Sequence, residues 1–469
     1  MAGYASGTGG NFAGRDPASH VTTIHGDGST GTVRFYRTTY DEPDPSLVDG
    51  FTITGGRHGV LMDTASWPRP EQITVSNSII EGNGVTDEYD HLGGGVLLSG
   101  NWITLSGNTI RNNHAGRGGG VGGAAGVTLE ENLIENNVSH GDHGGGLYLG
   151  GSGTIRGNRI YGNVTGGELG YGWGGGGLIF GNFFFFGNDI AFNAAPSHGG
   201  GLHIDEGGCV DFSRDLIRAN MTTESWAGGG AGLAVDDGEG LPSCASLYFC
   251  TVACNTSPGT NGGNGVYATG ASSVVVQNTI FWGNDASDFY AFGPEAVIDV
   301  SYSLSAEQPP GAGNIASDPL FADPHGGDFH LRSTAGRWET DGEAWVIDGE
   351  HSPAIDAADP GAPCGAETEP NGGRANLGIY GNTGEASRSG SGGPHSPGDC
   401  DENGSISIGE VQRAVNMFLG FEAPECGVDG DSSGTVSVGE VQAVINGFLG
   451  GSRQLFSGGR ELTPPPPRR

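Results

Sequence analysis

The chain has 469 residues, including 93 glycines and 24 prolines, and lacks any apolar run of the roughly 18 residues that a transmembrane helix needs. This composition predicts a turn-rich protein without a membrane span. The formal net charge is −34, and all 20 basic residues are arginine. Such an acidic surface repels nucleic acids and anionic membranes, so neither is expected as a partner.

No export signal is visible at the start, because residues 1–4 have neither a charged region nor an apolar core. Residues 21–28 already resemble the inside of a repeating coil. We therefore expect that an export signal and a capping turn are missing from this start. The predicted location is extracellular or at the cell surface.

Two short patterns alternate between Gly93 and Asn284. One is a glycine run followed by an aliphatic residue, and the other is Asn-x-Ile ending at a second Asn. The closing asparagines recur every 24 to 35 residues, at positions 83, 113, 137, 163, 193, 220, 255 and 284. A period of this length is typical of solenoids.

Aligning the repeats produces aliphatic columns with variable residues between them. A first strand contributes Val96, Val121, Leu147, Leu178, Leu202, Leu233 and Val266, then Leu98, Leu149, Phe180, Ile204 and Val235. The following strands contribute Leu105, Leu129, Ile155, Phe185, Phe212, Leu247 and Val275, then Ile110, Ile134, Ile160, Ile190, Ile217, Val252 and Ile280. Asparagines 108, 132, 158, 188 and 278 are expected to stack at one turn. Short strands with one buried face predict an all-β right-handed parallel β-helix, a solenoid whose coils bury one another.

From about residue 300 the pattern changes and includes Asp318-Pro319-Leu320-Phe321. Residues 20–388 resemble secreted bacterial right-handed β-helix repeat proteins of the pectate-lyase-like fold, and this pattern is similar to their closing region. The resemblance implies a fold and a surface location more than a chemistry. The expected domains are the β-helix at 1–300, the closing region at 301–388, a flexible linker at 389–397, a calcium module at 398–450 and a disordered tail at 451–469.

Two segments, 399–410 and 429–440, have the spacing of the twelve-residue EF-hand calcium loop, with oxygen ligands, a glycine at position 6 and Glu at position 12. An amphipathic helix follows each loop. The predicted Ca²⁺ ligands are Asp399, Asp401, Asn403, Ser405, Ser407 and Glu410, then Asp429, Asp431, Ser433, Thr435, Ser437 and Glu440.

The loop-helix duplicate resembles a dockerin, the all-α module that anchors bacterial polysaccharide-degrading enzymes to a cohesin. The resemblance implies a cohesin-like or other protein partner. Position 12 is Glu410 and Glu440, where dockerins usually have Asp, and positions 10 and 11 lack the familiar hydroxyl pair. Calcium is therefore expected from the residues themselves, whereas a cohesin is expected only from the resemblance.

The seven cysteines predict two bridges. Counting from the asparagine position places Cys209 and Cys244 in one column of adjacent coils, ~4.8 Å apart, so a cross-coil disulfide is sterically reasonable. Cys400 and Cys426 each lie beside the start of a calcium loop and are candidates for a second bridge. The odd total leaves at least one thiol free, and oxidised pairs imply an extracytoplasmic location.

A candidate catalytic site follows from the outward column Ser99, Ala124, Gly150, Gly181, Asp205, Asp236 and Thr269. Two carboxylates, Asp205 and Asp236, thus fall on adjacent coils, with His203 and Asp237 beside them. In the same coils the asparagine position holds Asp215 and Cys250. Stacked carboxylates can act as acid and nucleophile or base in glycosidic cleavage, or bind a cation. The alternative is a solvated acidic edge on a very acidic protein.

Loops before the glycine runs add Trp173, His198, Trp226 and His143 beside that strand. These rings are predicted to bind substrate, since aromatic rings stack on sugars, with incidental placement as the alternative. The motif set of polygalacturonases is incomplete, and the lack of lysine excludes a lyase that uses lysine as its base.

These features favour an exported β-helix protein that binds calcium through its C-terminal module and contacts glycans or protein partners along the solenoid. The competing hypothesis is a polysaccharide lyase or glycoside hydrolase that uses the carboxylates on adjacent coils.

Overall fold

The computed structural model describes residues 21–36, 46–63, 72–86, 90–166, 171–224, 229–259, 262–389, 398, 400, 406–426, 428–429 and 434–454. The chain divides into two compact units, one formed by residues 1–319 with 377–381 and the other by residues 320–376 with 382–469. Each unit is described separately below.

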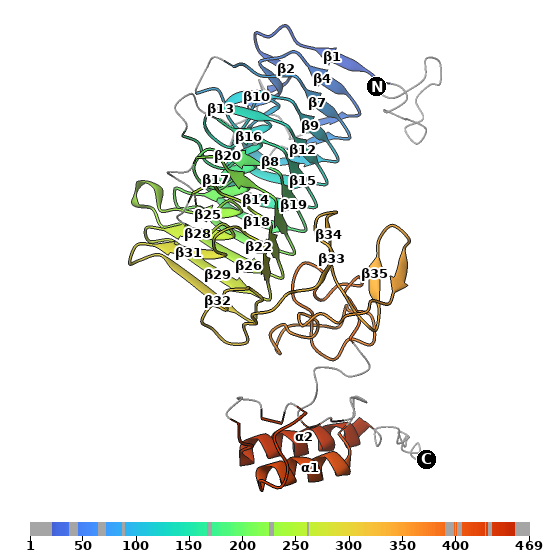
Figure 1. Cartoon of the computed structure of the whole chain (residues 1–469). Coiled ribbons are helices and arrows are strands. Elements are labelled where there is room, and N and C mark those ends of the chain that lie inside the picture. Colours follow the sequence, from blue (N-terminus) through green and yellow to red (C-terminus); the bar gives the residue numbers. More distant parts are fainter. Residues whose placement is uncertain are drawn as a thin grey trace, which may run out of the picture. The chain divides into compact units, whose positions relative to one another are not determined.

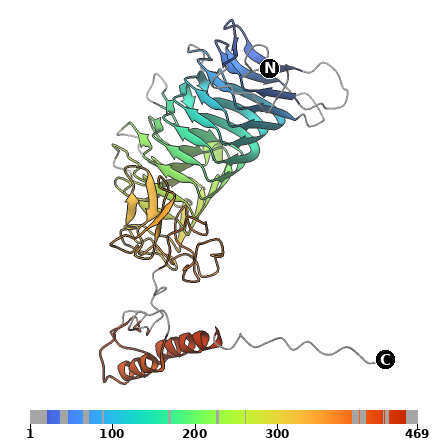
Figure 2. The same cartoon turned by 90° about the vertical axis from the view of Figure 1, so that its right-hand side faces the viewer.

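The first unit is a parallel β-helix in which strands pair with their equivalents in neighbouring coils (Figures 1 and 2). In a central coil the chain passes through face 1, face 2, sheet A and sheet C before the next glycine run. Sheet A has one strand for each of ten coils. Long strands β8, β11 and β14 continue from face 1 into face 2, which is why these two ladders are joined as one sheet.

The strands of each ladder are as follows. Sheet A contains β1 (Thr23–His25), β4 (Thr52–Thr54), β7 (Ile79–Glu81), β9 (Thr109–Arg111), β12 (Leu133–Glu135), β15 (Arg159–Tyr161), β19 (Asp189–Ala191), β23 (Leu216–Arg218), β27 (Thr251–Ala253) and β30 (Ile280–Trp282). Sheet C contains β10 (His114–Arg117), β13 (Val138–His143), β16 (Val164–Thr165), β20 (Ala194–Ala195) and β24 (Met221–Thr222). Face 1 contains β2 (Gly31–Tyr36), β5 (His58–Asp63), the first halves of β8 (Val96–Ser106), β11 (Val121–Glu130) and β14 (Leu147–Arg156), and then β17 (Gly177–Ile179), β21 (Leu202–Ile204), β25 (Leu233–Val235), β28 (Val266–Thr269) and β31 (Phe289–Phe292). Face 2 contains β3 (Ser46–Asp49), β6 (Ile73–Ser76), the second halves of β8, β11 and β14, and then β18 (Asn182–Phe186), β22 (Cys209–Ser213), β26 (Cys244–Tyr248), β29 (Ser273–Gln277) and β32 (Val297–Ser301).

The predicted aliphatic columns form one continuous core inside these ladders. One coil differs by a residue from the alignment on glycine runs. Gly177, not Leu178, stands in the first core column, because this coil has four consecutive glycines and the last already belongs to β17. Consequently Ile179 replaces Phe180 in the core, and Phe180 takes the outward position predicted for Gly181.

The last regular coil shows a similar displacement. Val276 and Phe281 face the core, in place of the predicted Val275 and Ile280. Val275 is 49% exposed. Because side chains alternate between the two faces of a strand, a displacement of one residue exchanges core and surface positions.

Two buried asparagine ladders run along the solenoid. The ladder before sheet A contains Asn108, Asn132, Asn158 and Asn188, and the ladder after it contains Asn83, Asn113, Asn137, Asn163, Asn193, Asn220, Asn255 and Asn284. At a typical step, the Asn137 side chain donates to the Ile110 carbonyl at 2.9 Å and to the Asn163 side chain at 3.0 Å. The first ladder continues through Asp215, Cys250 and Thr279, so the predicted member Asn278 lies one residue outside it. These bonds satisfy buried polar groups at the turns.

Both predicted disulfides, Cys209–Cys244 and Cys400–Cys426, are present. Cys209 and Cys244 pair directly in the register of β22 and β26, as counting along the coils predicted. Cys250, Cys254 and Cys364 are free thiols.

The second unit contains two antiparallel hairpins and two helices. β33 (Phe321–Asp323) pairs with β34 (Asp328–Leu331), and β35 (Arg337–Glu339) pairs with β36 (Ala344–Val346). Helices α1 (Ile408–Phe418) and α2 (Val438–Gln454) share a small core that includes Ala414 and Val444, and α2 runs past the expected module boundary at 450. Neither is apolar and long enough to be a candidate membrane span among the described residues.

Candidate functional site

Three of the four predicted catalytic residues gather on the outer surface of face 1. In β21, Leu202 and Ile204 enter the core, so His203 and the following Asp205 point outward. The backbone N–H of Asp236 donates to the Ile204 carbonyl at 2.9 Å, which places Asp236 beside Asp205 on the next coil. The strands of adjacent coils are ~4.8 Å apart.

Asp205 is held in place by backbone donors. Its Oδ1 accepts from the N–H groups of Glu206 at 2.7 Å and Gly238 at 2.8 Å, and its Oδ2 lies 3.6 Å from Nε2 of His203. The last distance is too long for a good hydrogen bond, so this contact is mainly electrostatic. Burial opposes ionisation of Asp205, but His203 and the two backbone donors outweigh it and lower the pKa of this carboxyl.

Asp236 has the opposite electrostatic environment. Burial raises its pKa above the ordinary aspartate value, and the neighbouring Asp205 adds to this effect, whereas His203 partly opposes it. The pair therefore contains one carboxyl with a lowered pKa and one with a raised pKa.

Asp237 is separated from the pair by its contacts. Its Oδ2 accepts from the backbone N–H of Ala271 at 3.0 Å, on the following coil. Asp237 thus holds a turn between β28 and β29. Asp237 follows Asp236 in the sequence, but the hydrogen bond of its carboxylate is made to the turn on the following coil.

The predicted rings form a line along the corner between sheet C and face 1. His143, Trp173 and His198 are bridge partners in successive coils. The ring centres of His143 and Trp173 are 4.9 Å apart and nearly parallel, and Trp173 lies 5.7 Å from the His203 ring. The fourth predicted member, Trp226, lies outside the described residues. This line of rings, called the ridge of face 1 below, therefore reaches the carboxylate pair through His203.

Sequence reasoning missed the tyrosines of this surface. Tyr148 and Tyr267 occupy the same outward column of face 1 as His203, and Tyr290 follows on the next coil. The Tyr267 ring stacks 5.2 Å from His198, and its distance to Tyr290 is 5.9 Å. The signal was the first variable position after each glycine-aliphatic pair, which holds an aromatic or imidazole ring in several coils.

Burial shifts two imidazoles of this line of rings, His198 and His143, toward their neutral forms. Burial and then the charge of His203 lower the pKa of His198 to about 4, and burial followed by Arg117 lowers that of His143. Both ring nitrogens of His203 are buried without a hydrogen-bond partner in the structure.

The described part of the calcium module shows two glutamates turned onto their own loops. Glu410 accepts from the backbone N–H groups of Cys400 at 2.6 Å and Ser407 at 2.8 Å, and Glu440 accepts from that of Ser437 at 2.7 Å. In both repeats the glutamate and a serine form reciprocal caps at the helix start.

Other predicted ligands can be placed only in part. Asp429 accepts from the Gly434 N–H at 2.8 Å across the second loop, and Thr435 is exposed. Six predicted ligands lie outside the described residues: Asp399, Asp401, Asn403, Ser405, Asp431 and Ser433. Among the residues that are described, no three His, Cys, Asp or Glu side chains gather in a metal-binding group.

Comparison with protein families identifies two regions. Residues 23–217 match the family model of a right handed beta helix region, and residues 251–358 match a model described as disaggregatase related. Comparison with curated proteins and with solved structures yields no significant match. The first match agrees with the stacked parallel strands of the solenoid.

Proposed function

This chain is a right-handed β-helix repeat protein, and we propose that it acts outside the cell by binding a polysaccharide along the ring-lined corner of face 1. The observation that carries the proposal is the line of stacked rings from His143 through Trp173 and His203 to His198 and Tyr267. The partly exposed rings of His143, Trp173 and His198 offer flat apolar surfaces to the faces of successive sugars, and the buried rings of His203 and Tyr267 pack against them.

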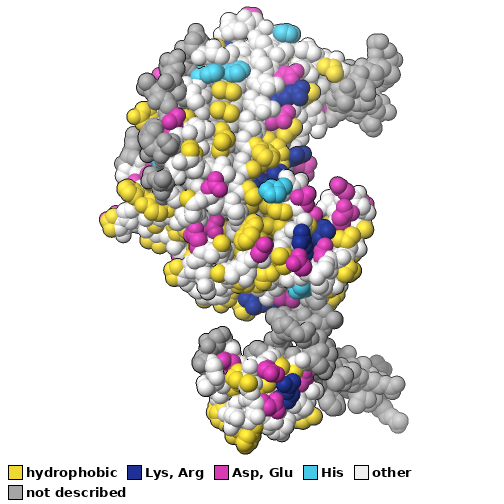
Figure 3. Space-filling view, viewed as in Figure 1, with side chains coloured by type: hydrophobic (Ala, Val, Ile, Leu, Met, Phe, Trp, Pro, Cys, Tyr) yellow, Lys and Arg dark blue, Asp and Glu magenta, His cyan; other side chains and the backbone are white. Residues whose placement is uncertain are grey.

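The polar groups beside the rings favour the same ligand class. Asp205 and Asp236 can hydrogen-bond sugar hydroxyls, while the protein's net charge of −34 disfavours polyanions. In Figure 3 the acidic side chains on the visible face of the solenoid are scattered and do not form one patch. We therefore favour a neutral or amino-sugar polysaccharide at this site.

An extracellular location is supported by covalent chemistry. The disulfides Cys209–Cys244 and Cys400–Cys426 belong to oxidising compartments. The match of residues 251–358 to a model described as disaggregatase related is consistent with an extracellular β-helix protein.

The C-terminal module is proposed to bind Ca²⁺ and to tether the chain to a protein partner. The support is two loops with the same ligand spacing and an acidic residue at position 12 in each, an oxygen-only donor set of the kind that calcium prefers. Calorimetric titration of the full chain should detect two calcium sites, and Glu410→Gln with Glu440→Gln should abolish them. Glu425→Gln, an exposed change in the same module, is the matched control; unchanged calcium binding in the double variant refutes the assignment.

Glycoside cleavage is the second candidate, favoured by the opposite pKa shifts of Asp205 and Asp236. Two neighbouring carboxyls whose pKa values are shifted in opposite directions are typical of catalytic acid and base pairs. Asp236 would protonate the leaving oxygen, and Asp205 would act as the nucleophile or base. The coil separation of ~4.8 Å is close to the ~5–5.5 Å between carboxyls in retaining glycosidases.

One experiment separates binding from cleavage. Wild type, Trp173→Ala and Asp236→Asn are assayed for retention on insoluble polysaccharides and for release of reducing or unsaturated ends. We expect Trp173→Ala to lose retention about tenfold, while Phe192→Ala, which removes an exposed ring directly after β19 of sheet A, retains it. Release that disappears in Asp236→Asn but survives in the exposed control Asp211→Asn establishes cleavage. Retention unchanged by Trp173→Ala refutes the face 1 site.

A further inference from the structure

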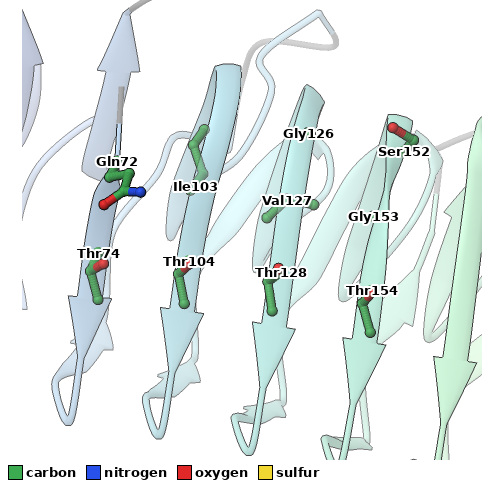
Figure 4. A pocket seen from close by; sticks show the side chains of 10 residues that line it. All are labelled: Gln72, Thr74, Ile103, Thr104, Gly126, Val127, Thr128, Ser152, Gly153 and Thr154. Atoms are coloured by element: carbon green, nitrogen blue, oxygen red, sulfur yellow. The ribbon is translucent and has the colours of Figure 1, made fainter. Parts of the chain in front are cut away.

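Face 2 carries a row of threonines that neither the catalytic nor the calcium hypothesis uses. Thr74, Thr104, Thr128 and Thr154 pair directly with one another across β6, β8, β11 and β14. Figure 4 shows them in line on four neighbouring strands. Their hydroxyl groups therefore repeat at the coil spacing of ~4.8 Å and span about 14 Å over three intervals.

A hollow lies over this row. Its volume is about 570 Å³, and its lining adds Gln72 and Ser152 to the threonines. The position beside Thr128 is Gly126, so this part of the lining carries no side chain. A threonine side chain can contact a ligand in two ways: its methyl group packs against apolar surface, and its hydroxyl both donates and accepts hydrogen bonds.

The lining of the hollow has no charged side chain. None of the ten residues that line the hollow is acidic or basic, although the whole chain has a net charge of −34. The adjacent outward positions hold Glu130 and Arg156, and these two side chains pair with each other. An ionic ligand would find no unpaired opposite charge among these residues.

The row ends at an exposed aromatic ring. Phe184 is the register partner of Thr154 on β18 and is 43% exposed. The Phe186 ring lies 6.2 Å away at an interplanar angle of 22°. An uncovered phenyl ring in line with a row of hydroxyl groups is a surface on which a sugar ring can stack.

We propose that this groove on face 2 binds an uncharged linear polysaccharide, which lies along the solenoid axis across the threonine row and stacks on Phe184. A glycan chain repeats its hydroxyl groups once per sugar, so a row of hydroxyls repeated once per coil can bond successive units. The groove is separate from the ridge of face 1 and does not depend on it. A second contact on the same chain raises the overall avidity for a long polysaccharide.

An extended peptide fits this surface less well. The strands under the groove are hydrogen-bonded on both sides to their neighbours, so they offer no free edge for an added strand. Side chains alone would have to hold a peptide, and the groove has no charged group or deep apolar pocket for one.

The test uses neutral β-linked gluco- and xylo-hexaoses as probes, titrated into the full chain by calorimetry. Thr128→Val removes a hydroxyl at nearly constant volume, and Phe184→Ala removes the ring. We expect each change to raise the Kd at least fivefold, and Thr128→Glu to raise it more than tenfold. The matched control is Val275→Ala, an exposed change in the same outward column beyond the groove. Far-UV circular dichroism checks that each variant keeps its strands.

Two further readouts decide the assignment. Affinity for the neutral probes should be the same in low and high salt, because no ion pair forms. It should also survive Trp173→Ala, the change that tests face 1. Failure of both hexaoses to bind overturns the proposal, as does binding that Thr128→Glu leaves intact. Binding lost only in Trp173→Ala overturns the face 2 groove and leaves the face 1 site standing.

Discussion

Replacing Asp215 by Asn restores a broken ladder and makes the stability of the solenoid less sensitive to pH. Asp215 is fully buried between Asn188 and Cys250. It accepts three hydrogen bonds, from the N–H and side chain of Asn188 and from the N–H of Ser213. The equivalent asparagines also donate to the preceding coil, as Asn188 does to Ile155. Only a protonated Asp215 can donate in this way.

The size of this effect on the free energy of unfolding follows from the pKa of Asp215. Burial outweighs the three donors and raises the pKa of Asp215 from 3.8 to about 7. Between these values the unfolded chain releases a proton that the folded chain keeps, so the free energy of unfolding falls as pH rises from 4 to 7. Above pH 7 the accumulated penalty is about 4 kcal/mol, from a shift of roughly three pKa units at 1.36 kcal/mol each.

The assay is urea unfolding of wild type and Asp215→Asn at pH 4 and pH 8. The variant should exceed the wild type by about 4 kcal/mol at pH 8 and by at most about 1 kcal/mol at pH 4. Taking the difference at each pH removes contributions from other titrating groups. Asp211→Asn, which removes an exposed carboxylate two residues before Ser213, is the matched control for the substitution itself. An equal gain for Asp215→Asn at both pH values would refute the reasoning.

Three more outcomes are expected. Acid should weaken the native state between pH 6.5 and pH 4, because the pKa of His198 is lowered to about 4, and His198→Phe should remove part of that loss in thermal melts. Replacing Cys209 and Cys244 by serine should cost about 2–4 kcal/mol in urea unfolding, and a stability equal to that of wild type would contradict a stabilising bridge. Phe281→Ala should cost about 3–5 kcal/mol because its ring is fully buried, while Val275→Ala should be nearly neutral; the reverse order would contradict the register of the last coil.

The sequence predicted much of this protein because a solenoid repeats one local rule. Glycine runs, alternating aliphatic residues and recurring asparagines were sufficient to predict the β-helix and the pairing of Cys209 with Cys244. They also placed Asp205, Asp236 and the rings of Trp173 and His198 on one surface. In such a fold residues one period apart in the sequence lie side by side on adjacent coils, so the repeat length predicts which residues are in contact.

Tertiary structure decided the details that depend on where each backbone turns. A fourth glycine moved Leu178 into the outward column of face 1, where it is still buried, and Asn278 lies one residue outside the ladder. Both residues nevertheless match the sequence motifs from which they were predicted. A sequence motif does not reveal a backbone displacement of one residue, yet such a displacement reverses which side chains face inward. The fixing of Asp205 by Gly238 and the neutral hollow over the threonine row likewise arise from contacts between coils, which the order of residues within one coil does not contain.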